Sequence, residues 1–393
     1  GAPIVALALG LGVTQIFIDD TYTNYFDERF EFRRHTDLIE RHLTGLEIVE
    51  FDVAAGEEGG VYDPAYIDKL ARFDAWMNAQ PKVAFTASML EIYDRLHEHF
   101  GSGGAQTPMI AVPDGVPPAL AHAVPADRAA LAQYVLTYEM SLPRGQDLAN
   151  KMTIDKSASR VSAILRDAST AEIRRFREAG EAWLRTQAPQ EMAGPGTGMA
   201  VMYAYLSSVN INAMIGGTAV TLVFISIFFV AAFRSVKFGA ISLLPNLLPG
   251  VLAFGIWGYL VGKIGLAVSI TGALTLGIIV DDTVHMIWRF REARRNGQNP
   301  DEALRTMFSV VGEPMLISTL VLVAGFTVLS TSGFYVTSAL GALSAMIVGI
   351  ALIADWFLLG PVLGWIERVA DARAAETAHP PAPKSAAGVS PVA

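Results

Sequence analysis

The chain has no cysteine among its 393 residues, and only 17% of its residues are charged. Without cysteine the protein has no disulfide framework, no thiol nucleophile and no thiolate metal site. It also has no stripe of lysine and arginine of the kind that follows a phosphate backbone. The sequence therefore excludes cysteine chemistry and gives no support to nucleic-acid binding.

What the chain does contain is apolar, since 52% of its residues are hydrophobic and its mean hydropathy is positive. These values are high for a soluble protein and ordinary for a membrane protein. The net charge of −9 is unevenly spread, because residues 19–191 hold 28 acidic and 18 basic residues. We therefore expect an acidic soluble part and a nearly neutral membrane part.

Five apolar segments follow residue 208, and most reach the roughly 20 residues that a spanning helix needs. They are Val209–Phe233, Phe238–Gly262, Ile264–Trp288, Pro314–Thr331 and Thr337–Ile366. Residues 1–18 are also apolar but lack a basic n-region, so they read as the outer part of a membrane helix whose beginning is missing. The expected domains are this partial membrane helix, a soluble domain (19–208), a five-helix membrane domain (209–370) and a disordered Ala/Pro-rich tail (371–393).

The charges of the loops predict the orientation in the membrane. Basic residues fill alternate loops: Arg234 and Lys237, then Arg289, Arg291, Arg294, Arg295 and Arg305, then Arg368 and Arg373. The other loops hold only Lys263 or no charge. By the positive-inside rule the basic loops and the C-terminus are cytoplasmic, and residues 19–208 lie on the outer side of the membrane.

Within residues 19–208 the pattern alternates between strands and helices. Strands are expected at 46–51, 82–85 and 159–165, and helices at 66–77, 89–100 and 170–185. Ser169 or Thr170 is the expected cap of the last helix. A Gly- and Pro-rich stretch, 101–118, marks a break between two α+β subdomains made of βαβ-like units. No catalytic triad, phosphate loop or metal cluster is recognisable here.

The most informative residues are two adjacent carboxylates, Asp281 and Asp282, inside the third apolar segment. A charge near the bilayer centre costs about 2.5–3.5 kcal/mol even on lenient insertion scales, so proton or ion handling is the first hypothesis. Gly277, Asp281 and His285 are one turn apart and share a helix face, where the glycine lets a neighbouring helix approach. Asp282 points about 100° away and is expected to pair with Arg289 or His285. The alternative for both acids is a structural hydrogen-bond lock between helices.

Other polar residues of the apolar segments are candidates for helix packing. Asp355 is expected to pin a neighbouring helix near the inner face. Three hydroxyl residues of the fourth segment are candidates to hydrogen-bond Asp281 across the bundle, although such residues commonly serve packing: Ser318, Thr319 and Thr327. His285 either relays protons, since imidazole titrates near neutral pH, or is a polar residue at the cytoplasmic interface. Asp281 and His285 alone do not make a metal site.

The G-x-x-x-D motif at Gly277–Asp281, on the fourth of six expected helices, resembles that of RND-superfamily transporters of the MMPL and Patched type. Two further stretches are typical of this family, Glu313–Leu320 (EPMLISTL) and Ala354–Pro361 (ADWFLLGP). The resemblance covers residues 1–370, in the order of the C-terminal half of the family's tandem architecture with its sterol-sensing-like (SSD) bundle. Asp282 is similar to the Asp-Asp form of Patched-like members, whereas MMPL proteins more often have tyrosine there.

This resemblance implies an α-helical multipass membrane bundle of six helices, the first truncated, with an external α+β ferredoxin-like porter domain. It also implies that Asp281 couples the proton-motive force to export of a hydrophobic lipid-, sterol- or hopanoid-like substrate, with no enzyme activity and no cofactor. Because the first half is absent, the expected partners are a separate N-terminal half or further copies of this chain, besides membrane lipids.

Two rival functions remain open. The first is a non-transporting lipid or sterol sensor, or a regulatory half-subunit of a membrane complex, which uses the same bundle as a switch. The second is an intramembrane aspartyl protease, which needs two carboxylates on facing helices and a G-x-G-D type signature. The adjacent pair Asp281 and Asp282 does not meet that requirement, so the protease is disfavoured.

Overall fold

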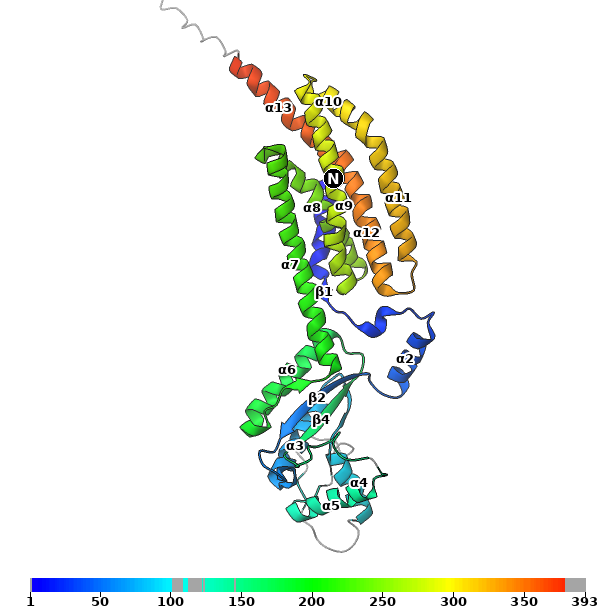
Figure 1. Cartoon of the computed structure of the whole chain (residues 1–393), viewed down its shortest axis with the longest axis vertical. Helices are drawn as coiled ribbons and strands as arrows, with labels where there is room; N and C mark the ends of the chain where they lie inside the picture. The colour runs from blue at the N-terminus through cyan, green and yellow to red at the C-terminus, as the bar shows by residue number, and fades with distance from the viewer. Residues whose placement is uncertain (1, 101–108, 112–121, 123, 145, 379–393) are drawn as a thin grey trace, which may run out of the picture. The chain divides into compact units, whose positions relative to one another are not determined.

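The computed structural model describes residues 2–100, 109–111, 122, 124–144 and 146–378 (Figure 1). Its contacts divide the chain into two compact units. We call Ile18–Ile211 the sheet unit, and Gly1–Phe17 together with Asn212–Ala393 the helical unit.

The sheet unit is built on four antiparallel strands in the spatial order β3-β4-β2-β5. The strands are β2 (Glu47–Ala54), β3 (Val83–Ala87), β4 (Ala158–Leu165) and β5 (Gly196–Thr197). Every second residue of β2 is buried, as an amphipathic strand requires. The three strands expected from the sequence are confirmed. The expected βαβ-like units exist only in split form, because β4 lies between β2 and β3.

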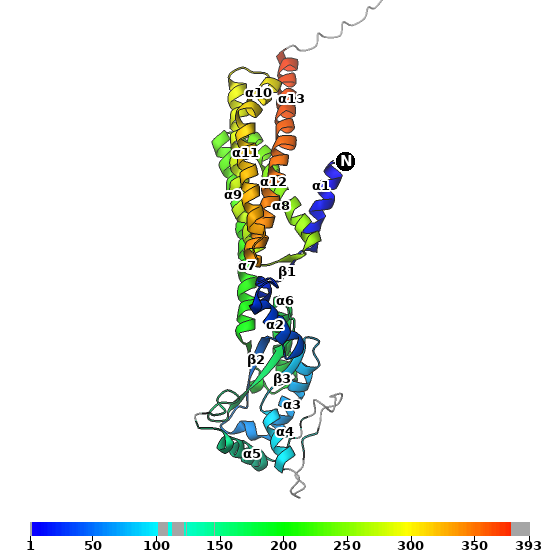
Figure 2. The same cartoon turned by 90° about the vertical axis from the view of Figure 1, so that its right-hand side faces the viewer.

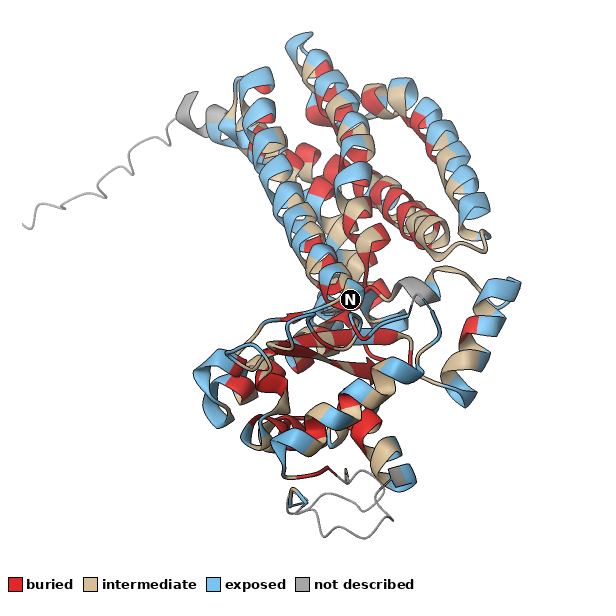
Figure 3. Ribbon diagram, turned by 60° about the horizontal axis from the view of Figure 1, so that its bottom comes forward, coloured by how far each residue is buried: buried red, intermediate tan, exposed pale blue. Residues whose placement is uncertain are grey.

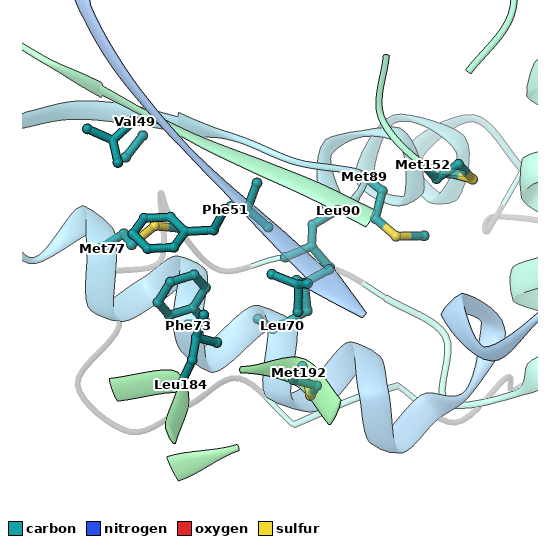
Figure 4. Packing of buried hydrophobic residues seen from close by; sticks show 14 of the residues in the cluster. Val49, Phe51, Leu70, Phe73, Met77, Met89, Leu90, Met152, Leu184 and Met192 are labelled. Carbon is teal, nitrogen blue, oxygen red and sulfur yellow. The ribbon is translucent and has the colours of Figure 1, made fainter. Parts of the chain in front are cut away.

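Two helices, α3 (Pro64–Asn78) and α6 (Thr170–Gln187), supply most of the aromatic core of this unit. Figure 4 shows Phe73 of α3 and Leu184 of α6 in this cluster with Phe51. Phe51 of β2 meets Phe73 of α3 edge to face, with 5.2 Å between ring centroids. A β-carbon on Gly180 of α6 would lie 2.4 Å from the Phe51 ring. A glycine is therefore needed for α6 to pack this closely against Phe51.

A capping box begins α6, as the sequence predicted for Ser169. The Ser169 hydroxyl accepts the backbone N–H of Glu172, and the Glu172 carboxylate accepts the backbone N–H of Ser169. This pair satisfies two donors that the first turn of a helix leaves open.

The remaining helices of the sheet unit are α2 (Glu31–His42), α4 (Leu90–Phe100) and α5 (Arg128–Ser141), with 3₁₀ turns at Tyr22–Tyr25, Gly60–Tyr62 and Gln190–Met192. The predicted break at 101–118 lies outside the described residues, apart from 109–111. Described residues on both sides of it, such as Leu90 and Leu131, belong to one hydrophobic cluster. The division into two subdomains stays a prediction.

The described part of the chain contains five helical spans that are long and apolar enough to cross a membrane. They are Met199–Phe233 (α7), Val236–Leu260 (α8), Leu266–Arg295 (α9), Pro300–Ser330 and Tyr335–Arg373. The fourth span comprises α10 (Pro300–Met307), a π-helix η6 (Phe308–Gly312) and α11 (Glu313–Ser330). The fifth comprises α12 (Tyr335–Ala354), a π-helix η7 (Asp355–Leu359) and most of α13 (Gly360–Ala378). These helices make the expected multipass bundle.

A short apolar helix, α1 (Ala2–Leu11), continues into a 3₁₀ turn at Gly12–Gln15 and lies beside α8 (Figure 2). A β-carbon on Gly12 would be 2.0 Å from the carbonyl oxygen of Gly255, and one on Gly258 would be 2.0 Å from that of Gly12. Small residues thus let the two backbones touch, as in packed membrane helices. Two-residue strands lie at Phe17–Ile18 (β1) and Lys263–Ile264 (β6), and the N–H of Phe17 donates to Gly262 O at 3.0 Å.

The C-terminal end of the bundle corrects one expectation. Disorder was expected from residue 371, but α13 runs to Ala378. Residues 371–378 (DARAAETA) contain mainly alanine, arginine and glutamate, which favour helix, and they extend a helix that is already nucleated. Residues 379–393 lie outside the described part of the chain.

Candidate functional site

The candidate site lies on α9, whose two long faces differ in burial. One face packs inside the bundle and is buried at Thr275, Leu276, Ile279, Thr283, Met286, Ile287 and Phe290. The opposite face is exposed in this chain at Leu274, Gly277, Asp281, His285 and Trp288. The spacing of three and four residues within each set is that of a helix face.

We call Gly277, Asp281 and His285 the α9 stripe. Asp281 Oδ1 lies 3.5 Å from His285 Nε2, and the two side chains are 75% and 63% exposed. A β-carbon placed on Gly277 would meet no atom within 4 Å. The close approach of a neighbouring helix that the glycine predicted is therefore not made by the described residues, and the stripe points away from the chain's own core.

Asp282 does not make the ion pair expected of it. His285 lies beside Asp281 instead, and the Arg289 Nη1 donates to Glu292 at 2.8 Å. The reason is helical geometry, since His285 is four residues from Asp281 and faces it directly, while Asp282 is turned about 100° towards the half-buried side.

A network of buried polar groups occupies the inner face of α9. The Thr283 hydroxyl is 3.1 Å from Asp355 Oδ1 and 3.2 Å from Asn246 Oδ1. The amide nitrogen of Asn246 donates to Ser242 O at 2.7 Å within α8. All four residues are buried. Asp355 thus contacts a neighbouring helix through one hydrogen bond, and its packing role stays a prediction.

The Thr283 hydroxyl has three oxygens within hydrogen-bonding reach, because Ile279 O of its own helix also lies at 3.3 Å. A hydroxyl has one proton, so it donates to one of these oxygens at a time. Because the Asn246 amide nitrogen serves Ser242, its oxygen faces Thr283 and can only accept. Thr283 therefore connects three helical spans through one hydroxyl group.

The hydroxyl residues of α11 do not reach Asp281. Ser318 and Thr327 each donate to a carbonyl of their own helix, Met315 O at 3.0 Å and Val323 O at 2.7 Å. Thr319 is buried, and no bond from it to Asp281 is present among the described residues. Back-bonding to the preceding turn is the usual choice of Ser and Thr in apolar helices.

Two π-helices meet near the network. Asp355 is the first residue of η7, and Trp356 packs edge to face on Phe308, the first residue of η6, with 6.2 Å between centroids. A β-carbon on Gly360 would be 3.0 Å from the same Phe308 ring. Single-turn π-helices inside α-helices occur frequently at functional sites.

Two polar clusters of the sheet unit were not predicted. His122 contacts Asp74 through Nε2 at 3.2 Å and Asp94 through Nδ1, and Asp74 is only 1% exposed. Burial alone lowers the pKa of His122, but hydrogen bonds to both carboxylates and their charges outweigh it and raise the pKa to about 9. One feature of the sequence could have indicated this cluster. Asp74 is an acid within the expected 66–77 helix, among apolar residues that are buried in the structure.

The second cluster surrounds Asp20, which is buried. Its carboxylate accepts hydrogen bonds from Tyr25 at 2.7 Å and Ser207 at 2.8 Å, and the Tyr25 and Tyr203 hydroxyls are 2.8 Å apart. Burial raises the pKa of Tyr25 above its ordinary value, and the bonds to Tyr203 and Asp20 raise it further. The described residues contain no group of three or more His, Asp or Glu side chains arranged to hold a metal ion.

Five long apolar helical spans, with polar networks enclosed between them, define a multipass helical membrane protein. The particular family follows from sequence comparison. The MMPL family matches residues 120–366, so this chain belongs to the MMPL family, whose members are membrane transporters of the RND type. It is also 29% identical over 150 residues to MJ1562 of Methanocaldococcus jannaschii, which is described only as a candidate membrane protein. That match covers 38% of each chain.

Proposed function

We propose that the protein exports a hydrophobic, lipid-like substrate and couples this export to the proton-motive force through Asp281. The observation that carries the proposal is the α9 stripe, an acid and a histidine that lie side by side on an exposed face of an apolar membrane helix. A carboxyl group at that depth is a costly element to retain, and intramembrane acids commonly serve proton transfer.

The exposure of the stripe also supports a partner. An ionisable side chain within a bilayer faces protein or a water-filled path rather than lipid. The described residues of this chain leave Asp281 uncovered and leave open space at Gly277. The surface that covers the stripe in the membrane then belongs to an N-terminal half of the transporter or to a second copy of this chain.

The chemistry of coupling needs only a change of charge. Asp281 accepts a proton, and the nearby imidazole of His285 is placed to receive it or to pass it on. Asp282, half-buried beside them, adds a second carboxyl that opposes simultaneous ionisation. Protonation removes the charge from the stripe and so changes how closely the covering surface can pack against α9.

The sheet unit fits the role of a porter domain. Its order of elements, β2-α3-β3 followed by β4-α6-β5, and its antiparallel strand order give the split βαβ arrangement of ferredoxin-like domains. In this proposal the unit lies in the periplasm of a bacterial inner membrane and hands the substrate outward.

The proposed topology has a direct test, because the chain has no cysteine. Ile154→Cys, at a side chain that is 91% exposed, should react with a membrane-impermeant maleimide added to intact cells. Asn296→Cys, at the end of α9, should react only after the inner membrane is opened. The reverse pattern would overturn the assignment of residues 19–208 to the outside.

Asp281→Asn tests the coupling itself. The amide keeps the size and the hydrogen bonding of the side chain but cannot titrate, and it is less costly to insert than a carboxylate. Efflux driven by a pH gradient in vesicles, normalised to inserted protein and with any N-terminal half co-expressed, should fall to background. Asp281→Glu, which keeps a titratable group, is the matched control and should retain part of the activity.

The same assay separates a transporter from a sensor. Wild-type efflux that stops when the proton gradient is collapsed supports the exporter. Absence of efflux at any gradient, together with binding of a lipid or sterol by the intact bundle, favours the non-transporting sensor or regulatory half-subunit. Wild-type rates in Asp281→Asn would show that the carboxylate is structural.

A further inference from the structure

A basic pocket lies at the end of the helical bundle where α9 stops, α8 begins and α13 passes. It has a volume of about 320 Å³ and is lined by Phe238, Arg291, Arg294, Arg295, Gly297, Gln298 and Glu367. Three of these side chains are guanidinium groups and one is a carboxylate. Volumes of about 300–1,000 Å³ are typical of small-molecule sites.

The charges around the pocket do not cancel. Arg294 reaches Asp371 at 2.6 Å and lies 3.5 Å from Glu367, and Lys237 holds the other oxygen of Glu367 at 2.7 Å. With Arg291 and Arg295 the site has four cations against two carboxylates, an excess of two positive charges. The pocket is therefore suited to an anion that carries more than one oxygen.

The three arginines differ in how many hydrogen bonds and ion pairs they make with the protein. Arg291 donates one bond, to Phe233 O at 2.7 Å, and its guanidinium lies over the Phe238 ring at 4.7 Å, which fixes its position. Arg294 is engaged with the protein through all three nitrogens, because Nη1 donates to Gln298 O at 2.8 Å, Nη2 donates to Asp371, and the buried Nε faces Glu367. Arg295 is exposed and makes no hydrogen bond or ion pair with the described residues. Several guanidinium N–H groups thus remain available to a ligand.

The position of the pocket along α9 indicates its depth relative to the membrane. Trp288 and Trp365 are 54% and 63% exposed on α9 and α13, as tryptophans at a membrane interface commonly are. Arg291 to Arg295 follow Trp288 by one to two turns, about 5–10 Å of helix rise. That step from the edge of the hydrocarbon reaches the level of lipid phosphates.

We propose that this pocket binds the phosphate group of an anionic membrane phospholipid. Arg295 and the free N–H groups of Arg291 donate to its oxygens, Arg294 adds its positive charge, and Phe238 contacts the adjoining glycerol or acyl carbons. The lipid is held as a bound structural ligand beside the junction of α8 and α9, separately from any transported substrate. Guanidinium groups recognise phosphate with paired, charge-assisted hydrogen bonds.

Lipid titration against the purified full chain tests this site. Native mass spectrometry in detergent should show phosphatidylglycerol binding more tightly than phosphatidylcholine with the same acyl chains. Arg295→Gln should weaken phosphatidylglycerol binding about tenfold, the effect of losing roughly one charge-assisted hydrogen bond. Because Arg295 has no partner within the described chain, this change leaves the bundle intact.

Arg305→Gln is the matched control, since it removes the same charge from an exposed arginine of the same region outside the pocket. It should leave phosphatidylglycerol binding unchanged. Equal binding of the two lipids, or equal loss in Arg305→Gln and Arg295→Gln, overturns the site. Displacement of phosphatidylglycerol by inorganic phosphate alone would assign the pocket to a soluble anion and overturn the lipid proposal, whereas resistance to phosphate supports it.

Discussion

Both faces of α9 contain polar residues, but the polar residues of the two faces differ in the partners that they bond. On the inner face Thr283 is buried and bonded to Asn246 and Asp355, so its polar atoms are fully engaged within the chain. On the outer face the ion-pair partner of Asp281 among the described residues is His285, one turn away. A polar group with fixed hydrogen-bond partners holds helices together. A polar group without fixed partners can gain or lose a proton, or form a new contact.

Glycines show the same contrast. A β-carbon on Gly341 of α12 would lie 2.7 Å from Phe326 O of α11, so this glycine is required by a neighbour within the chain. A β-carbon placed on Gly277 would have no atom of the described residues within 4 Å. Gly216 of α7 and Gly325 of α11 also have no atom within 4 Å of a β-carbon, so the empty space alone does not distinguish Gly277. What distinguishes Gly277 is its place one turn from Asp281, on the face where the proposed partner packs.

The largest effect is expected from filling the space at Gly277. Gly277→Leu should reduce gradient-driven efflux by at least tenfold, because the side chain keeps the covering surface away from Asp281. Thermal stability of the purified chain should not fall, since no atom of the chain lies within reach. Efflux in vesicles and thermal unfolding in detergent are the two measurements.

Gly216→Leu is the control for this substitution. Gly216 is an exposed glycine of α7 that also has no atom within 4 Å of a β-carbon, and Figure 3 shows α7 exposed along most of its membrane-spanning length. The change should be silent in both measurements if α7 faces lipid at that point. Equal loss of efflux in the two variants would remove the distinction between the α9 stripe and any other exposed helix face.

A smaller effect, on stability, is expected from the inner face. Thr283→Val keeps the shape of the side chain but leaves Asn246 and Asp355 without their common partner, which should cost about 2–3 kcal/mol. Asp355→Asn should cost less than about 1 kcal/mol, because an amide of the same shape can still form a hydrogen bond with Thr283. Chemical unfolding of the bundle compares the two variants. A greater loss in Asp355→Asn than in Thr283→Val would mean that Asp355 stabilises the bundle through more than this one hydrogen bond.

The outer face of α9 could be predicted from sequence because it depends on one helix. The spacing of Gly277, Asp281 and His285 fixes their common face whatever packs against it. The inner network could not be predicted, because Thr283, Asn246 and Asp355 come from three separate helical spans whose rotation is set by packing. The sequence analysis singled out Asp355 as a packing residue, but it did not identify Asn246 or Thr283 as its partners.

The sheet unit shows the same limit. Alternation along β2 and the capping residues of α6 are local, and both were predicted correctly. Strand β5 has two residues and no alternation to detect, and its place beside β2 depends on the close contact at Gly196. The His122 cluster joins residues 48 and 28 positions apart, which no periodic pattern reports.

The smallest predicted effect concerns that cluster and the pH dependence of stability. The pKa of His122 is about 9 in the folded chain, above the usual value of about 6.5 that it regains on unfolding. A raised pKa means that its stabilising contribution is complete below about pH 6.5 and is lost as pH rises through about 9. Allowing for solvent screening at a partly exposed group, the loss should be about 1–2 kcal/mol.

His122→Gln provides the test, because glutamine keeps a hydrogen-bonding side chain between Asp74 and Asp94 but cannot carry the charge. Amide hydrogen exchange of α3 and α4 in the full chain should quicken from pH 6.5 to 9 in the wild type, after correction for the intrinsic rate, and should show less change in the variant. His99→Gln, at an exposed histidine of α4, should behave as wild type. A wild-type profile that is flat over this range would mean that the charge of His122 does not stabilise the cluster.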